Sequence, residues 1–259
     1  MLEWIARGLH KRRITTGYPR REEPAPAGFR GSIAVLDTDD GAGELARLCP
    51  TAAIAVDSNR RVSVDRGRCI LCGACVERAP ERFAFEHRYE TAARMRSALT
   101  VPQNAEPALE PLRATLGEQA RALRRSIHVR HIDCGSDGSE EWEIQALWNP
   151  YYDIQRLGFF LTAAPRHADV LLVTGPVTTA MRRPLERAWQ VMPAPKALVA
   201  VGTDACSGGL STAGELGAGG VDAVLAVDVY VPGSPPPPIA IMHGLLLATG
   251  LLRPREVTA

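Results

Sequence analysis

The chain has 259 residues, of which 46% are hydrophobic, so it is long enough to form two compact domains with cores of their own. Thirty basic residues against 29 acidic ones leave a formal charge of +1, and this balance does not indicate a nucleic acid partner. The N-terminus lacks the uninterrupted apolar stretch of a signal peptide. The longest apolar run, at residues 239–252, is broken by His243 and too short to span a bilayer. We therefore expect a cytoplasmic protein.

The first half of the sequence divides into an extension, a cysteine-bearing unit and a connector. Residues 1–28 begin with a short amphipathic segment and continue into a proline-rich stretch. Residues 29–94 contain four of the six cysteines, and short strands are predicted at residues 31–36, 54–57 and 61–64. In the connector, residues 95–125, leucines recur with helical spacing at positions 109, 112, 116 and 123. This spacing predicts a linker that ends in a docking helix.

Residues 126–259 alternate apolar, strand-like runs with segments of helix length. Strands are predicted at residues 127–132, 169–174, 197–201 and 223–229, and helices at residues 141–147, 178–191 and 237–249, with Pro184 kinking or bounding the second helix. This alternation is typical of an α/β fold, in which helices cover both faces of a mostly parallel sheet. Because ligand sites form beyond the carboxyl ends of such strands, we expect the loops at residues 134–140, 175–178, 202–209 and 232–236 to converge on one crevice.

Four cysteines stand in a pattern typical of a cubane iron-sulfur centre. Cys69, Cys72 and Cys75 are separated by two-residue gaps, and Cys49 directly precedes Pro50. Three thiolates at this spacing together with a remote Cys-Pro hold a 4Fe-4S cluster. The alternative is a zinc site on the same thiolates, although zinc favours paired Cys-x-x-Cys knuckles over a run of three cysteines. In a chain without an export signal, cysteines are expected to be ligands or reduced thiols rather than disulfides.

This cysteine pattern resembles the bacterial-type ferredoxins, in which two Cys-x2-Cys-x2-Cys-x3-Cys-Pro runs bind two 4Fe-4S clusters and the last cysteine of each run binds the other cluster. The second run aligns on Cys69, Cys72, Cys75 and Ala79. The first run aligns on Asp39, Ala42, Leu45 and Cys49. With this crossed assignment, the resemblance implies that one cluster keeps all four of its thiolates and that the other keeps none.

Five segments of the second half carry a further resemblance: SIHVRHID at residues 126–133, NPYYD at 149–153, PRHAD at 165–169, VTGPVT at 173–178 and VYVPG at 229–233. They are similar to the small subunit of membrane-bound energy-converting nickel-iron hydrogenases and formate hydrogenlyases, and more distantly to the B-type subunit of respiratory complex I. The front half, with TGYP at residues 16–19, resembles the ferredoxin-like subunit of those complexes. The resemblance implies a fusion of two neighbouring subunits, in which a small ferredoxin-like α+β domain precedes a flavodoxin-like parallel-sheet domain at residues 126–259.

In that family the small subunit carries a proximal 4Fe-4S cluster beside the active site of the large subunit. The aligned thiolate positions in this chain are Asp137, Glu140, Asp204 and Ser234. Because oxygen side chains are poor replacements for thiolates on a soft iron-sulfur core, we expect this cluster to be absent. Cys134 and Cys206 fall in the same loops, but two thiolates fall short of four, and we interpret them as buried reduced thiols. The three carboxylates, with Ser234 or Glu141 as a further candidate ligand, then form either a Mg2+ or Ca2+ site or a solvated polar patch.

The resemblance implies an iron-sulfur electron-transfer and scaffold subunit of a hydrogenase-related or complex-I-related oxidoreductase assembly, with one 4Fe-4S cluster as its cofactor. Its partners would be a hydrogenase-like large subunit and membrane subunits, which would hold it on the inner face of the cell membrane. No catalytic residue of such chemistry is visible in the sequence. Two alternatives stay open: a structural subunit whose cluster takes no part in turnover, and a module that binds a hard cation in the crevice.

Overall fold

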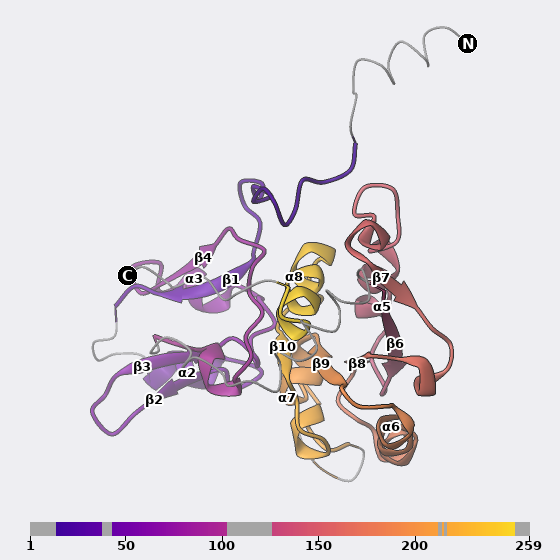
Figure 1. The fold of residues 1–259 in the computed structure, drawn as a ribbon. Coiled ribbons are helices and arrows are strands. Elements are labelled where there is room, and N and C mark those ends of the chain that lie inside the picture. Colours follow the sequence, from indigo (N-terminus) through magenta and orange to yellow (C-terminus); the bar gives the residue numbers. More distant parts are fainter. Residues whose placement is uncertain (1–13, 38–42, 103–125, 212–213, 215–216, 252–259) are drawn as a thin grey trace, which may run out of the picture.

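Two units make up the part of the chain that the computed structural model describes, residues 14–37, 43–102, 126–211, 214 and 217–251 (Figure 1). The small unit lies to the left in Figure 1 and the larger unit to the right. The predicted docking helix, the amphipathic start of the extension and positions 39 and 42 of the first ferredoxin run lie outside the described residues. Within the described ranges, no helix is both long and apolar enough to cross a membrane.

A five-stranded parallel sheet forms the centre of the larger unit. Its strands are β6 (Ile127–Asp133), β7 (Phe159–Leu161), β8 (Val170–Thr174), β9 (Ala197–Val201) and β10 (Val229–Val231). Their order is β10-β9-β8-β6-β7, and every adjacent pair is parallel. Counted within this unit, the order is the flavodoxin-like 2-1-3-4-5, so the predicted fold class is confirmed. The strand order reverses between β6 and β8, which is where ligand sites form in such folds.

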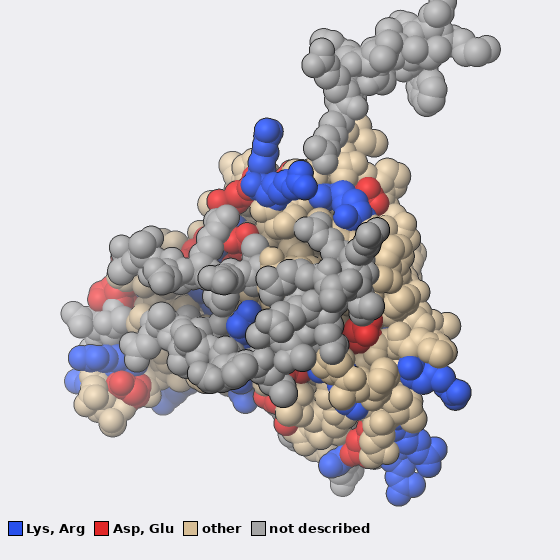
Figure 2. Space-filling model, in the orientation of Figure 1, with Lys and Arg blue, Asp and Glu red and all other residues tan. Residues whose placement is uncertain are grey.

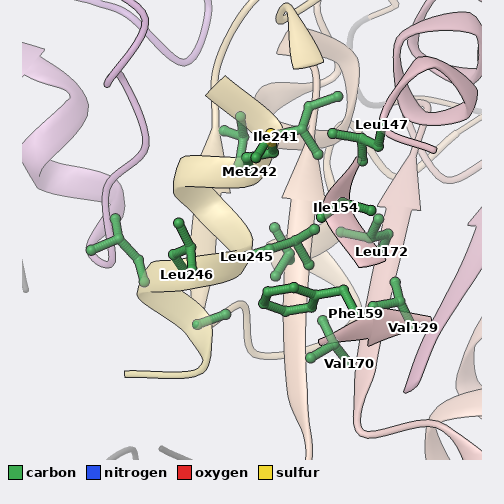
Figure 3. Packing of buried hydrophobic residues seen from close by; sticks show 14 of the residues in the cluster. Val129, Leu147, Ile154, Phe159, Val170, Leu172, Ile241, Met242, Leu245 and Leu246 are labelled. Carbon is green, nitrogen blue, oxygen red and sulfur yellow. The ribbon is translucent and has the colours of Figure 1, made fainter. Parts of the chain in front are cut away.

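Helices cover both faces of this sheet. α5 (Ser139–Ala146) and α8 (Pro238–Ala248) pack on one face, and α6 (Thr179–Val191) and α7 (Thr203–Ser207) on the other. Figure 3 shows Met242 and Leu245 of α8 beside the apolar side chains of the sheet, among them Val129 and Leu172. All residues of β8 and β9 are buried, which explains why both strands are continuous apolar runs.

Several details of the larger unit differ from the prediction. The strand predicted at residues 223–229 is wrong, because a short 3-10 helix, η4 (Val221–Ala223), ends there and β10 begins only at Val229. The intervening apolar side chains pack against the core on the α6 face without joining the sheet. α6 continues through Pro184, so this proline does not bound the helix. β7, α7 and two further 3-10 helices, η2 (Ile154–Leu157) and η3 (Pro165–His167), were not predicted.

The small unit matches the predicted ferredoxin-like α+β domain. β1 (Ser32–Val35) pairs antiparallel with β4 (Phe83–Glu86), and β2 (Ile54–Val56) pairs antiparallel with β3 (Val62–Asp65). α2 (Gly43–Leu48) follows β1, and α3 (Ala74–Arg78) follows β3. A 3-10 helix, η1 (Arg96–Leu99), leads into β5 (Thr100–Val101), which pairs with β3. The small domain's sheets therefore include residues that the sequence analysis assigned to the linker.

Residues 92–96 connect the two units by hydrogen bonds at the edge of β10, and we call this segment the strap. Ala93 and Tyr230 exchange backbone hydrogen bonds of 2.9 and 2.7 Å. The Ala92 N–H donates to Nδ1 of His243 in α8 at 3.3 Å. Arg96 donates to both carboxylate oxygens of Asp65, at 2.7 and 2.6 Å, and its Nε donates to the carbonyl of Cys206 at 3.2 Å. The strap therefore places the cysteine-bearing unit directly against the parallel-sheet unit.

The described part of the N-terminal extension is also held by the larger unit. Tyr18 is 1% exposed and belongs to the core on the α8 face. The Thr16 N–H donates to the carbonyl of Tyr151 at 2.9 Å, and Arg156 donates to the carbonyls of Thr16 and Tyr18. The TGYP segment therefore has a packing role.

The charged surface is mixed in sign on the face that Figure 2 shows. Basic side chains gather at the lower right, where Figure 1 places α6, and Arg182, Arg183 and Arg187 of that helix are exposed. Elsewhere on this face acidic and basic side chains alternate, which agrees with a net charge of +1.

Candidate functional site

The four cysteines of the ferredoxin-like pattern line one hollow of about 460 Å³ that is open to solvent at its mouth. Cys49 follows α2, Cys69 and Cys72 lie in the loop between β3 and α3, and Cys75 lies in the first turn of α3. Cys72 is exposed, and the other three thiols are partly buried. The remaining lining is mostly apolar, with Ile33, Ile54, Val64 and Phe85 among it. The fold therefore brings together residues that are 26 positions apart in sequence at the widest, from Cys49 to Cys75.

Backbone amides point at the sulfur atoms in this hollow. The Ala53 N–H donates to Sγ of Cys49 at 3.2 Å, and the Leu71 N–H donates to Sγ of Cys69 at 3.4 Å. Positive φ angles occur in both turns that carry these donors, 50° at Ala52 beside the Ala53 amide, and 55° at Leu71 and 89° at Gly73 in the loop after Cys69. N–H donors to sulfur stabilise the negative charge of thiolates and of a cluster bound to them.

The pKa of Cys69 is raised to about 12, mainly by burial and also by the neighbouring Cys75, Cys49 and Cys72, although the hydrogen bond from the Leu71 amide lowers it. Burial also raises the pKa of Cys75. Thiols of this kind lose their protons when they bind a metal centre, whose positive charge replaces that of the proton. An apolar hollow with four thiols and inward-pointing amides fits a 4Fe-4S cluster.

Two arginines lie beside the cysteine-bearing loop, and the side chain of Arg30 bonds it directly. Arg30 donates from Nη1 to the carbonyls of Leu71 and Cys72, at 3.1 and 3.0 Å, and lies over the ring of Phe85 at 5.0 Å. Arg66 donates to the carbonyl of Ile33 at 2.9 Å and to Glu86 at 2.6 Å. Burial lowers the pKa of Arg66 to about 10 although Glu86 opposes the shift. Both cations lie close to the place where a reduced cluster would add negative charge.

The loops at the carboxyl ends of the parallel strands bring Asp137, Glu140 and Asp204 together. The Ser139 hydroxyl lies 2.6 Å from Oδ1 of Asp137 and 3.2 Å from Oε2 of Glu140, so either carboxylate can accept its one proton. Glu140 is 3% exposed, and its pKa is raised to about 7, mainly by burial and also by the charges of Asp204 and Asp137. Burial and the charge of Asp137 likewise raise the pKa of Asp204. We call these three residues and Ser234, which is exposed, the acidic crevice.

The carboxylates of the acidic crevice pack closely on glycine backbone. A Cβ atom built on Gly202 would lie 2.4 Å from Oε1 of Glu140, and one built on Gly209 would lie 1.8 Å from Oδ1 of Asp204. In the described ranges, no group of three or more His, Cys, Asp or Glu side chains is placed so that it could hold a single metal ion.

Cys134 and Cys206 are both fully buried, and burial raises the pKa of each thiol to about 12. Both belong to the core on the α6 face of the sheet. The Cys134 N–H donates to the carbonyl of Thr174 at 2.9 Å, and Sγ of Cys206 lies 3.9 Å from the carbonyl of Ala200. Their surroundings are those of space-filling reduced thiols.

Two features beside the crevice were not predicted from the sequence. His131 on β6 lies 3.0 Å from the hydroxyl of Thr174, which donates to Glu141 together with the hydroxyl of Ser136. Burial lowers the pKa of His131, against the charge of Glu141. The second feature is Thr203, which contacts the cysteine-bearing loop from α7. Glu141 was a further candidate ligand in the sequence, but nothing in the pattern indicated its pairing with Thr174 and His131, and nothing marks Thr203.

Residues 137–248 match the family described as the 20 kDa subunit of NADH ubiquinone oxidoreductase. A probable membrane-bound hydrogenase subunit, mbhJ, of Pyrococcus furiosus is 37% identical over 137 residues, which cover 53% of this chain and 82% of the relative. The chain belongs to this family. Residues 62–110 match a second family, the 4Fe-4S single cluster domain, and this range holds Cys69, Cys72 and Cys75. The matches confirm the predicted resemblance and imply an iron-sulfur cluster in the small domain.

Two further relatives match at similar identity. Formate hydrogenlyase subunit 7 of Escherichia coli is 40% identical over 156 residues, 60% of this chain and 60% of the relative. The B-type subunit of the NADH-quinone oxidoreductase of Clostridium beijerinckii is 40% identical over 117 residues, 44% of this chain and 69% of the relative. The chain thus spans less than two thirds of the formate hydrogenlyase subunit.

Proposed function

We propose that this chain is an iron-sulfur electron-transfer and scaffold subunit of a membrane-associated oxidoreductase assembly related to hydrogenases and complex I. One 4Fe-4S cluster would be held by Cys49, Cys69, Cys72 and Cys75. The proposal rests on one observation. The four thiols line the same apolar hollow, where backbone amides donate to the sulfur atoms of Cys49 and Cys69. A cluster of this kind supplies one-electron reduction and oxidation.

The residues around the hollow have separate tasks in this proposal. The four thiolates hold the iron atoms, and the amides of Ala53 and Leu71 lower the negative charge on two of the sulfur atoms. Arg30 fixes the carbonyls of Leu71 and Cys72, so that the loop keeps its shape when the charge of the centre changes. Cys72 is the exposed ligand and marks the side on which an outside donor or acceptor can approach.

The proximal cluster of the family is absent in this proposal. Its aligned positions carry Asp137, Glu140, Asp204 and Ser234, and oxygen side chains suit hard cations better than a soft iron-sulfur core. The burial of Glu140 and its close packing on Gly202 support the same conclusion, because the carboxylate already occupies space in the crevice.

The partners would be a hydrogenase-like large subunit and membrane subunits, which would hold the chain at the inner face of the cell membrane. Two relatives support this by their names, as subunits of a formate hydrogenlyase and of a probable membrane-bound hydrogenase. The chain itself contributes no catalytic residue in this proposal. Its larger domain would act as the scaffold on which the large subunit is assembled.

Iron analysis and EPR spectroscopy of the purified full chain test the cluster. We expect about four irons per chain and a 4Fe-4S signal after reduction. Replacing any one of Cys49, Cys69, Cys72 or Cys75 by serine should remove most of the signal. Cys134→Ser and Cys206→Ser are the matched controls and should keep it. About eight irons per chain would contradict the single-cluster proposal, and stoichiometric zinc without iron would contradict the cluster itself.

Potentiometric EPR on the whole complex separates electron transfer from a purely structural role. In the electron-transfer proposal the cluster is reduced and reoxidised while the complex turns over. A signal that never changes during turnover would favour the structural alternative, in which metal binding only supplies folding energy.

A further inference from the structure

The short helix α7 contacts the turn that leads into the cysteine run at both ends of the helix. At its first residue, the Thr203 hydroxyl donates to the carbonyl of Cys69 at 3.1 Å. At its other end, the carbonyl of Cys206 accepts from Arg96, which also holds both carboxylate oxygens of Asp65. Asp65 in turn accepts from the Gly67 N–H at 2.9 Å. The turn from position 65 to position 69 is therefore fixed to α7 at its beginning and at its end.

The hydroxyl of Thr203 has two acceptors within reach, the carbonyl of Cys69 at 3.1 Å and that of Gly233 at 3.0 Å. A threonine hydroxyl has only one proton to donate. The Gly233 carbonyl already accepts from the backbone N–H of Thr203 at 2.7 Å. The carbonyl of Gly233 therefore keeps a donor when the hydroxyl proton points to the carbonyl of Cys69, and because Thr203 is 1% exposed, water does not compete for that proton.

We propose that Thr203 is a positioning residue for the iron-sulfur centre, and that its hydroxyl raises the reduction potential of the cluster held by Cys69. This inference rests on the proposed function, since it requires a cluster on the four thiolates. A carbonyl oxygen beside a cluster presents negative partial charge, and donation from a buried hydroxyl offsets that charge. The reduced cluster carries one more negative charge than the oxidised one, so the reduced state gains more from the bond.

Reduction of the cluster requires no chemical change at Thr203. One electron from an outside donor, such as dithionite in the experiment below, enters the cluster, and no bond to Thr203 forms or breaks. The threonine keeps its proton in both states. The same helix carries Asp204, at a position where the family places a proximal thiolate, so α7 would serve the retained cluster by supporting it instead of binding a second one.

Redox titration of the full chain with its cluster, followed by EPR, tests this proposal. Thr203→Ala and Thr203→Ser both lose the γ-methyl group, and only the serine variant keeps the hydroxyl. We expect a shift of the midpoint potential to a more negative value in the alanine variant and a value near that of the unmodified chain in the serine variant. Thr249→Ala is the matched control, because Thr249 is fully buried and donates to the carbonyl of Leu245 at 2.8 Å within α8.

The experiment distinguishes a failure of the cluster proposal from a failure of the role proposed for Thr203. An unmodified chain without a 4Fe-4S signal would overturn the cluster itself. A normal signal with equal midpoint potentials in the alanine and serine variants would overturn the role of Thr203. If the alanine variant fails to retain a cluster, retention by the serine variant under the same conditions supports the positioning role, and equal loss in both overturns it.

Discussion

Glu140 is a buried carboxyl group whose pKa is raised to about 7, first by burial and then by Asp204 and Asp137. Between pH 4.5 and pH 7 the unfolded chain releases this proton and the folded chain keeps it, so the free energy of unfolding falls as the pH rises through this range. Glu140→Gln removes this loss. We expect the variant to be more stable than the unmodified chain at pH 8, by about 3 kcal/mol at most, and similar to it near pH 4. Denaturant unfolding at both pH values measures the difference.

Asp137 provides a control in the same crevice, because its pKa is shifted in the direction opposite to that of Glu140. Its pKa is lowered by the hydrogen bonds from the Ser139 side chain and backbone. The charged form of Asp137 therefore stabilises the fold at neutral pH, and this contribution is lost as the pH falls through the lowered pKa. Asp137→Asn should be less stable than the unmodified chain at pH 8, and the difference should shrink in acid. Parallel pH profiles for both variants would contradict the burial of Glu140 in the folded protein.

The sequence predicts the cysteine ligands of the cluster, but it does not predict the residues that position them. The spacing of Cys69, Cys72 and Cys75 already carries the geometry of a cluster loop, and Cys49 follows from the remote Cys-Pro of the same pattern. Thr203 has no such pattern, because its role depends on a contact with Cys69, 134 positions away. The burial of Glu140 was missed for the same reason: it depends on the packing of α5 against the loop before α7.

At the scale of elements, the start of α7 depends on the absence of a side chain at Gly202. This residue has a φ angle of 93°, and a Cβ atom on it would meet Oε1 of Glu140 at 2.4 Å. Gly138 before α5 has a similar φ of 91° with no atom within 4 Å of a built Cβ. We expect Gly138→Ala to cost about 1 kcal/mol for the backbone alone. Gly202→Ala should cost about 1 to 3 kcal/mol more, because the ψ of 158° at Gly202 lies in a region open essentially to glycine, whereas Gly138 has a ψ of −6°, and because the buried carboxylate must move. Thermal and denaturant unfolding of both variants measures this.

The double variant Glu140→Ala with Gly202→Ala separates the two contributions. If contact with the carboxylate causes the extra loss, the double variant should recover it, and the coupling energy of the cycle should be clearly different from zero. Additive effects would show that Gly202→Ala acts through the backbone alone.

The elements that the sequence predicted well are those whose burial is uniform. β8 and β9 are fully buried, and their apolar runs match the predicted strands closely. The apolar residues at 223–229 misled the strand prediction, because Val224, Leu225 and Val227 pack against the core from a loop. β7 has three residues and α7 five, too few to show a period. Hydrophobic patterning therefore indicated the sheet, and the short elements that shape the site followed only from the tertiary structure.

At the scale of the whole molecule, Arg96 connects the two units through Asp65 and the carbonyl of Cys206. The side chains of this ion pair are only 26% and 21% exposed, so losing the arginine leaves a largely shielded carboxylate without its main partner. We expect Arg96→Met to reduce the free energy of unfolding by about 1 to 3 kcal/mol. It should also raise the hydrogen-exchange rates of the turn at residues 65–69, because that turn is held to α7 through this side chain.

Arg68 provides the matched control for this prediction, since it approaches the same carboxylate. Its Nε lies 3.7 Å from Asp65, and its side chain is 47% exposed, so its ion pair is weak and screened by solvent. Arg68→Met should leave the exchange rates of the turn nearly unchanged and alter stability by less than about 0.5 kcal/mol. If both variants loosen the turn equally, Asp65 responds only to the charge near it. If Arg96→Met alone does so, the turn is held by the specific hydrogen bonds of Arg96 to Asp65 and to the carbonyl of Cys206, and not by positive charge near Asp65.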